Sequence, residues 1–238
     1  LLQLAGALWY YYEISGSLTP AIQMFGEAAQ QLRSDQPDIA LARARLRALQ
    51  AWFLALIGLP EDGLRFANES VGILQQHGQK ADFLTLVAIP INALWLNRRE
   101  ELRQAAQDLM VWAEDQTDAE WERGWVLVWW AYSLLIDQRF EEAIAVSDEA
   151  LGIARNLGNP YFLRGAEQAD AINYRRMRQV CYETLGTIAL FENDIDLAEH
   201  YALACLRITH DSGQTRETLA ALRDLAQVNM ARNNPEFA

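Results

Sequence analysis

A helical spacing of apolar residues, interrupted at short intervals, constrains the fold of this chain more than any other feature. Apolar residues recur every three or four positions, as at Leu41, Ala44 and Ala48, and alternation of period two is not sustained anywhere. Most other positions hold Ala, Leu, Gln, Glu or Arg, which favour helices. The pattern predicts an all-α protein of about eleven helices, over residues 1–15, 19–33, 38–57, 61–77, 80–97, 99–115, 118–137, 140–157, 160–191, 195–211 and 215–232.

The predicted helices group into hairpins that repeat along the chain. One small or apolar residue lies near the start of each second helix, and we call these the crossing residues: Ala21, Gly63, Leu102, Ala143, Ala198 and Ala238. They are 42, 39, 41, 55 and 40 residues apart, so the fourth spacing contains an insertion, which we place within residues 160–180. Two helix axes approach closely only where side chains are small. The residue twelve positions before the crossing residue is small in four repeats: Ala51, Ala131, Gly186 and Ala226.

Two segments carry the repeat most clearly. In one, Leu185 and Gly186 are followed by Phe191, Ala198 and Cys205; in the other, Ala131 is followed by Phe140, Ala143 and Ala150. This pattern resembles the tetratricopeptide repeat, in a longer variant of roughly forty residues. It is similar to the sensor arrays of bacterial signal-transduction ATPases and their associated transcription activators. The resemblance implies a right-handed α-solenoid of stacked antiparallel helix hairpins.

The repeat pattern extends over the whole chain. We predict one solenoid domain over residues 1–238, with five repeats and the first helix of a sixth. The first helix begins without a cap, and the last carries Leu219, Leu222 and Met230 with no second helix after it. Since the terminal repeats of such arrays need polar outer faces, we expect a fragment of a larger protein. A continuation of the chain, or a second copy in a homodimer, would then cover the terminal helices.

Composition and motifs weigh against several function classes. The 20 Lys and Arg against 32 Asp and Glu give a net charge of −12, which disfavours direct binding of nucleic acid. His200, Cys205 and His210 are five residues apart, a spacing that does not place them on one helix face, so we expect no metal site. The sequence has no Gly-rich phosphate loop and no Gly-x-Ser-x-Gly motif. We therefore predict neither an enzyme nor a cofactor.

The sequence also indicates a compartment. The longest apolar run, residues 125–136, is too short to cross a bilayer, so we expect no membrane contact. Cys181 and Cys205 are too few for a disulfide scaffold, which favours a reducing compartment and a cytoplasmic protein. We expect both cysteines to be small buried residues that face each other across a hairpin.

Aromatic and large apolar residues recur at fixed distances before the crossing residues. In a stacked array the first helices line the concave face, and these positions point towards it. One interpretation is an open binding groove, and the other is that tight winding buries the same residues between repeats. The groove candidates are Tyr10, Trp52, Ile91, Trp95, Trp125, Tyr132 and Phe191.

One basic cluster, Arg175, Arg176 and Arg178, falls within the predicted insertion. It is either a solvated surface that pairs with nearby acids such as Asp170 and Glu183, or a docking point for an acidic partner or a phosphate.

Three hypotheses for function follow. The first is a protein- or peptide-binding scaffold that serves as a sensor or regulatory segment of a larger bacterial signalling or transcription-regulatory protein. The second is a small-molecule sensor with an apolar, aromatic-lined pocket. The third is a structural array that contacts other domains of its own protein.

Pro90 lies inside the helical pattern of residues 80–97. Proline removes one backbone hydrogen bond and collides with the preceding turn. We therefore predict a kink near Ile89, or a break of this helix into two pieces.

Overall fold

The computed structural model describes residues 2–34, 36–116, 119–157, 169–211 and 215–233. Within these ranges the regular structure is entirely helical, in twelve helices labelled α1 to α12. Helices that follow one another in the sequence pack against each other in space. The predicted all-α class, built from successive helix hairpins, is confirmed.

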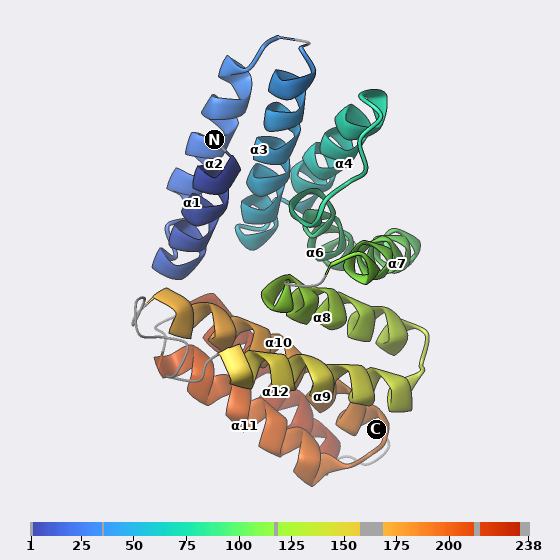
Figure 1. Ribbon diagram of the computed structural model, residues 1–238. Helices are drawn as coiled ribbons and strands as arrows, with labels where there is room; N and C mark the ends of the chain where they lie inside the picture. Colours follow the sequence, from blue (N-terminus) through green and yellow to red (C-terminus); the bar gives the residue numbers. More distant parts are fainter. Residues whose placement is uncertain (1, 35, 117–118, 158–168, 212–214, 234–238) are drawn as a thin grey trace. The chain divides into compact units, whose positions relative to one another are not determined.

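The chain divides into two compact units, Leu1–Glu122 and Arg123–Ala238, which we call the N-terminal and C-terminal units. Helix α3 packs between α2 and α4 in the N-terminal unit, and α6 packs against α4 and α7 (Figure 1). The helices of this unit are α1 (Leu2–Ser15), α2 (Leu18–Gln31), α3 (Pro37–Leu56), α4 (Pro60–Gln76), α5 (Phe83–Leu86), α6 (Ala88–Trp95) and α7 (Arg99–Glu114).

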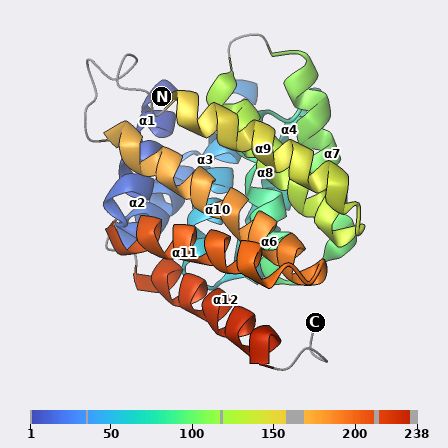
Figure 2. The ribbon, with the colours of Figure 1, turned by 90° about the horizontal axis from the view of Figure 1, so that it is seen from below.

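In the C-terminal unit, α9, α10, α11 and α12 pack in succession (Figure 2). Helix α8 (Glu120–Ile136) begins in the N-terminal unit and continues into this one. The other helices are α9 (Phe140–Leu157), α10 (Ala169–Phe191), α11 (Ile195–Asp211) and α12 (Thr215–Asn233). That both units belong to one continuous array stays a prediction.

The turns inside the five hairpins share one backbone feature. The residue five positions before each crossing residue has a positive φ, between 53° and 83°, and these residues are Gly16, Gly58, Asn97, Gln138 and Asn193. In the last four turns the next residue donates its N–H to the carbonyl oxygen five positions earlier, at 2.8–3.0 Å. This closure satisfies carbonyls at the end of the first helix and reverses the chain. The repeat register predicted from the sequence is confirmed at these turns.

The crossing residues are buried where the structure describes them. Ala21, Ala143 and Ala198 have no exposed surface, and Gly63 and Leu102 are also buried. Their burial is consistent with the predicted helix crossings at these positions. The sixth crossing residue, Ala238, lies outside the described residues.

Pro90 divides the first helix of the third hairpin. Helix α5 ends at Leu86 and α6 begins at Ala88, so the predicted break into two pieces is confirmed. Pro90 has no N–H, so it cannot donate the hydrogen bond that a continuous helix would make to the carbonyl of Leu86. The predicted start at residue 80 is wrong, because α5 begins at Phe83.

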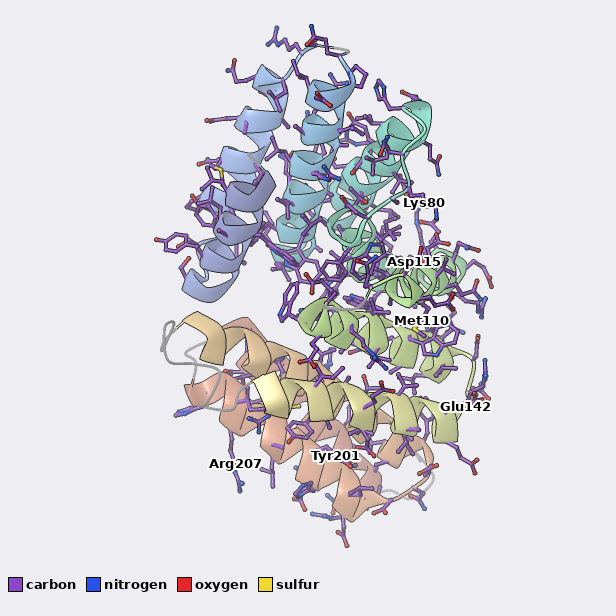
Figure 3. The ribbon with its side chains drawn as sticks, viewed as in Figure 1. Lys80, Met110, Asp115, Glu142, Tyr201 and Arg207 are labelled. Carbon is purple, nitrogen blue, oxygen red and sulfur yellow. The ribbon has the colours of Figure 1, made fainter. Side chains whose placement is uncertain are left out.

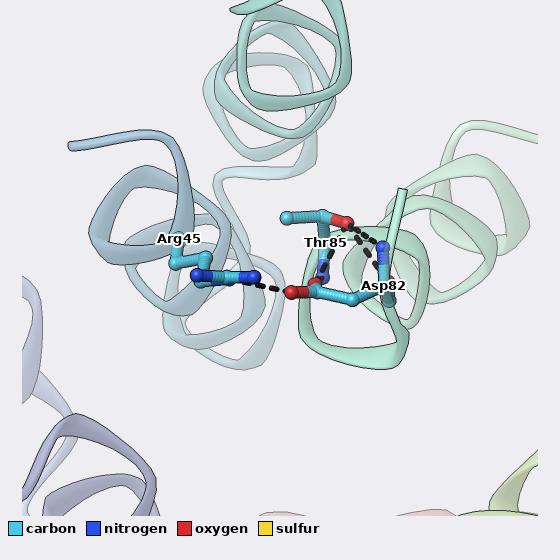
Figure 4. Close-up of polar contacts among 3 residues, drawn as sticks. All are labelled: Arg45, Asp82 and Thr85. Atoms are coloured by element: carbon cyan, nitrogen blue, oxygen red, sulfur yellow. Dashed lines mark hydrogen bonds and ion pairs between the residues drawn. The ribbon is translucent and has the colours of Figure 1, made fainter. Parts of the chain in front are cut away.

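Asp82 sets that start and connects α5 to α3. Its Oδ1 accepts the N–H of Thr85 at 3.1 Å, and the Thr85 hydroxyl oxygen accepts the Asp82 N–H at 2.9 Å, which together form a capping box (Figure 4). Nε of Arg45 on α3 lies 2.5 Å from Asp82 Oδ2. Lys80 pairs with Asp115 at 3.9 Å, but both side chains are exposed, so this pair stabilises the unit little (Figure 3).

Candidate functional site

Aromatic rings fill the space between the first helices of the N-terminal unit. The Trp9 ring lies 5.5 Å from Trp52, 6.3 Å from Phe83 and 5.2 Å from Trp121, measured between ring centroids. Phe83 also contacts Trp112 and Trp121, at 5.4 and 5.5 Å. Edge-to-face pairs at such distances are favourable beyond the area they bury. The rings therefore form a core inside this unit, where an open groove was one interpretation of the sequence.

Three of the predicted groove residues are core residues. Trp52 is 1% exposed, Ile91 6% and Trp125 2%. The Trp125 ring stacks on Trp129 at 6.4 Å. The groove interpretation is corrected for these three residues, because a side chain with so little exposed surface offers no contact to a peptide. These three side chains match the other interpretation of the sequence, which is burial between packed helices.

The remaining groove candidates do not share one environment. Trp95 and Phe191 are exposed at the ends of α6 and α10, beside hairpin turns, and Phe191 stacks on Phe140 at 5.6 Å. Tyr132 is half-buried in α8. The side chain of Tyr10 lies outside the described part of the structure.

Most of the basic cluster also lies outside the part of the chain whose side chains the structure describes. The side chains of Arg175 and Arg176 are not described, and Arg178 is half-buried on α10. The proposed contact with an acidic partner stays a prediction.

A small pocket, open to solvent, lies between α10, α11 and α12 of the C-terminal unit. Thr187 and Gln227 in its wall stand eleven residues before their crossing residues, the same repeat position as Trp52 and Tyr132. At this repeat position the N-terminal unit places the core residue Trp52, whereas the C-terminal unit places Thr187 and Gln227 in the wall of a pocket. Its lining residues are Tyr182, Glu183, Gly186, Thr187, Leu190, Ala198, Ala202, Cys205, Asp224, Gln227 and Val228.

Two carboxylates, Glu183 and Asp224, give the pocket its charge. Gln179 Nε2 donates to Glu183 Oε1 at 2.9 Å, and Arg223 donates to Asp224 Oδ1 at 2.8 and 3.0 Å. The Thr187 hydroxyl donates to the carbonyl oxygen of Glu183 at 2.8 Å. The sequence singled out Glu183 only as an acid near the arginine cluster and did not single out Asp224, although Glu183 lies one helical turn before Thr187.

Two acidic groups of the C-terminal unit, Cys205 and Tyr132, respond to this negative charge. Burial raises the pKa of the Cys205 thiol far above its ordinary value, and the carboxylates of Glu183 and Asp224 raise it further. Burial likewise raises the pKa of Tyr132, with Glu183 as the second cause. A thiol with so high a pKa is protonated at neutral pH and is a poor nucleophile.

Cys181 and Cys205 are both buried and both free thiols, as the sequence predicted. Cys205 Sγ donates to the carbonyl oxygen of Gln179 at 3.4 Å. Burial raises the pKa of Cys181 to about 12. Among the residues the structure describes, no group of three His, Cys, Asp or Glu side chains is placed to hold a metal ion. No helix in the same ranges is long and apolar enough to cross a membrane.

Within the described residues, fold and pocket define an all-α protein of helix hairpins with a small pocket on its last three helices that carries two carboxylates. No protein-family model matches the chain, and no curated protein matches it in sequence.

Proposed function

We propose that the chain is a protein- or peptide-binding repeat scaffold without enzymatic activity. The polar pocket of the C-terminal unit supports this proposal, because its wall combines side chains of two successive first helices, Thr187 on α10 and Gln227 on α12, with two carboxylates. In this proposal the hairpins are of the tetratricopeptide-like type. The chain serves as a sensor or regulatory segment of a larger cytoplasmic bacterial signalling or transcription-regulatory protein.

The pocket favours one ligand group over others. Glu183 and Asp224 would attract a cation, and their oxygens match the donors of a Lys or Arg side chain. A peptide that presents one basic side chain to these carboxylates matches the charge of the pocket better than an apolar inducer does.

Peptide display against the 238-residue chain tests the proposal. We expect enriched peptides to share a Lys or Arg, and the paired substitutions Glu183→Gln and Asp224→Asn to weaken their binding at least tenfold in calorimetry. The control substitutes two exposed acids of the same unit, Glu141→Gln and Glu192→Gln, which removes the same charge away from the pocket.

Two outcomes would reject it. Enriched peptides whose affinity is unchanged by the pocket substitutions would show that the pocket is not the binding site. A screen that enriches no peptide would favour the structural-array hypothesis instead.

A further inference from the structure

Helix α12 carries an apolar stripe on the side that its own unit does not cover. Leu219, Leu222 and Met230 are 62%, 46% and 58% exposed, and Ala226 between them is exposed too. The spacing of three, four and four residues places all four on one helix face. We call these residues the α12 stripe.

The opposite face of α12 accounts for its packing within the unit. Ala221 and Val228 are buried, and Val228 packs in a cluster with Ala189 of α10 and Ala198 of α11. Leu219 and Val228 are nine residues apart, which is about two and a half turns, so the stripe faces away from α10 and α11. The stripe is therefore a second apolar face, additional to the one that holds α12 in place.

In α10 and α8, the repeat positions that correspond to the α12 stripe contact the second helix of the same hairpin. In α10 the positions that correspond to the α12 stripe are Gln179, Tyr182, Gly186 and Leu190. Tyr182 stacks on Tyr201 of α11 at 5.9 Å, and a Cβ at Gly186 would lie 3.3 Å from the Cβ of Tyr201. These positions of α10 thus form its contact with the antiparallel second helix of the hairpin.

Helix α8 shows the closest chemical match to the stripe. Its corresponding residues are Gly124, Leu127, Ala131 and Leu135, of which the first three are buried and the last is partly buried. Leu135 packs beside Ala143 in the cluster that joins α8 to α9. The α12 stripe has Leu222, Ala226 and Met230 where α8 has Leu127, Ala131 and Leu135. A helix with the properties of α9 would therefore fit the α12 stripe.

We propose that the α12 stripe binds an antiparallel amphipathic helix of a partner polypeptide, in the way that α8 binds α9. That helix carries a small residue at the position that Ala143 holds in α9, with larger apolar residues on either side. A second copy of this chain is a poorer occupant, because α2, α4 and α11 already pack on first helices of their own hairpins. Two copies with a charge of −12 each also repel. This inference is independent of the pocket.

The test uses a fluorescent peptide with the sequence of α9, residues 140–157, titrated with the 238-residue chain. We expect saturable binding that Leu222→Asp weakens at least tenfold. Val111→Asp, at a valine 63% exposed on α7, is the matched control and leaves the affinity unchanged. A peptide with Ala143→Phe, which is too large for the helix crossing, is expected to bind at least tenfold more weakly to the unmodified chain.

Three results would overturn the proposal. The first is the absence of saturable peptide binding, and the second is equal binding by the Leu222→Asp variant. The third is a dimer in sedimentation equilibrium that Leu222→Asp dissociates, which would assign the stripe to a second copy of the chain.

Discussion

At the scale of single residues, two glycines of the N-terminal unit make room for buried amides. A Cβ at Gly63 would lie 2.0 Å from Asn92 Oδ1, and Asn92 Nδ2 donates to the carbonyl oxygen of Ala51 at 3.2 Å. A Cβ at Gly26 would lie 2.5 Å from Gln50 Nε2. Each glycine belongs to the second helix of one hairpin and each amide to the first helix of the next. The absence of a side chain therefore lets a polar group connect successive hairpins.

Alanine at Gly63 is expected to destabilise the N-terminal unit by about 1–3 kcal/mol, because the added methyl overpacks a buried, hydrogen-bonded site. The matched control is Gly72→Ala in the same helix, where a Cβ meets nothing within 4 Å. There the gain in helix propensity is expected to stabilise the unit by about 0.5–1 kcal/mol. Urea unfolding of the two variants measures both changes, and equal signs would contradict the packing argument.

The buried thiols make stability depend on alkaline pH. Burial holds the pKa of Cys181 at about 12 in the folded chain, above its value near 8.5 in an unfolded chain. The unfolded state then loses its proton first, so the stability is fully present below about pH 8.5 and is lost as pH rises towards the folded pKa. We expect the urea midpoint to fall between pH 8 and 11, and to fall less in Cys181→Ala.

Tyr132 is the internal comparison for that measurement. Burial raises its pKa and that of the remaining thiol, Cys205, so a smaller decline that begins near pH 8.5 is expected to persist in the Cys181→Ala variant. An identical pH profile in the variant and the unmodified chain would show that the Cys181 thiol does not contribute.

At the scale of secondary-structure elements, the hairpin turns are the most regular part of the molecule. Five first helices are each followed by a residue with positive φ at the same repeat position. Glycine and asparagine enter this left-handed region most easily, and four of the five turns use them. Gln138, with φ 58°, is the exception, so its turn between α8 and α9 is strained relative to the others.

Glycine at Gln138 is therefore expected to stabilise the C-terminal unit by about 1 kcal/mol, the usual cost of the left-handed conformation for a residue with a Cβ. The same change at Gln107, exposed in the middle of α7, is expected to destabilise by about 1 kcal/mol, because glycine weakens a helix interior. Thermal unfolding of the two variants distinguishes the effects by sign, and a destabilising Gln138→Gly would refute the strain argument.

At the scale of the whole molecule, the chain consists of two compact units joined through the continuous helix α8. In repeat proteins each hairpin contacts mainly its neighbours, so a local change lowers stability mainly nearby. We expect each unit to respond by itself to a substitution in its own core.

Hydrogen exchange of two variants tests this independence. Gly63→Ala is expected to lower amide protection in α3, α4 and α6 and to leave α10, α11 and α12 unchanged. Val228→Ala, at a residue 1% exposed in the α10–α12 cluster, is expected to do the reverse. Loss of protection throughout the chain in either variant would show that the units unfold together.

The repeat position also predicted part of the candidate site. Thr187 and Gln227 both stand eleven residues before a crossing residue, so the repeat places them on successive first helices. Glu183 was expected only as an acid near the arginine cluster, and Asp224 was not expected. Their role in the pocket depends on how α10, α11 and α12 are turned towards one another.

By itself, the sequence determined the helices, their grouping into hairpins, the buried crossing residues and the break at Pro90, because periodicity, caps and proline act within a few residues of the chain. Only the tertiary structure decided which first-helix side chains become core. Trp52 and Trp125 occupy ligand-facing repeat positions and are buried, whereas Phe191 and the α12 stripe remain exposed. The physical reason is that burial depends on the angle and distance between successive hairpins, which packing between residues far apart in the sequence sets.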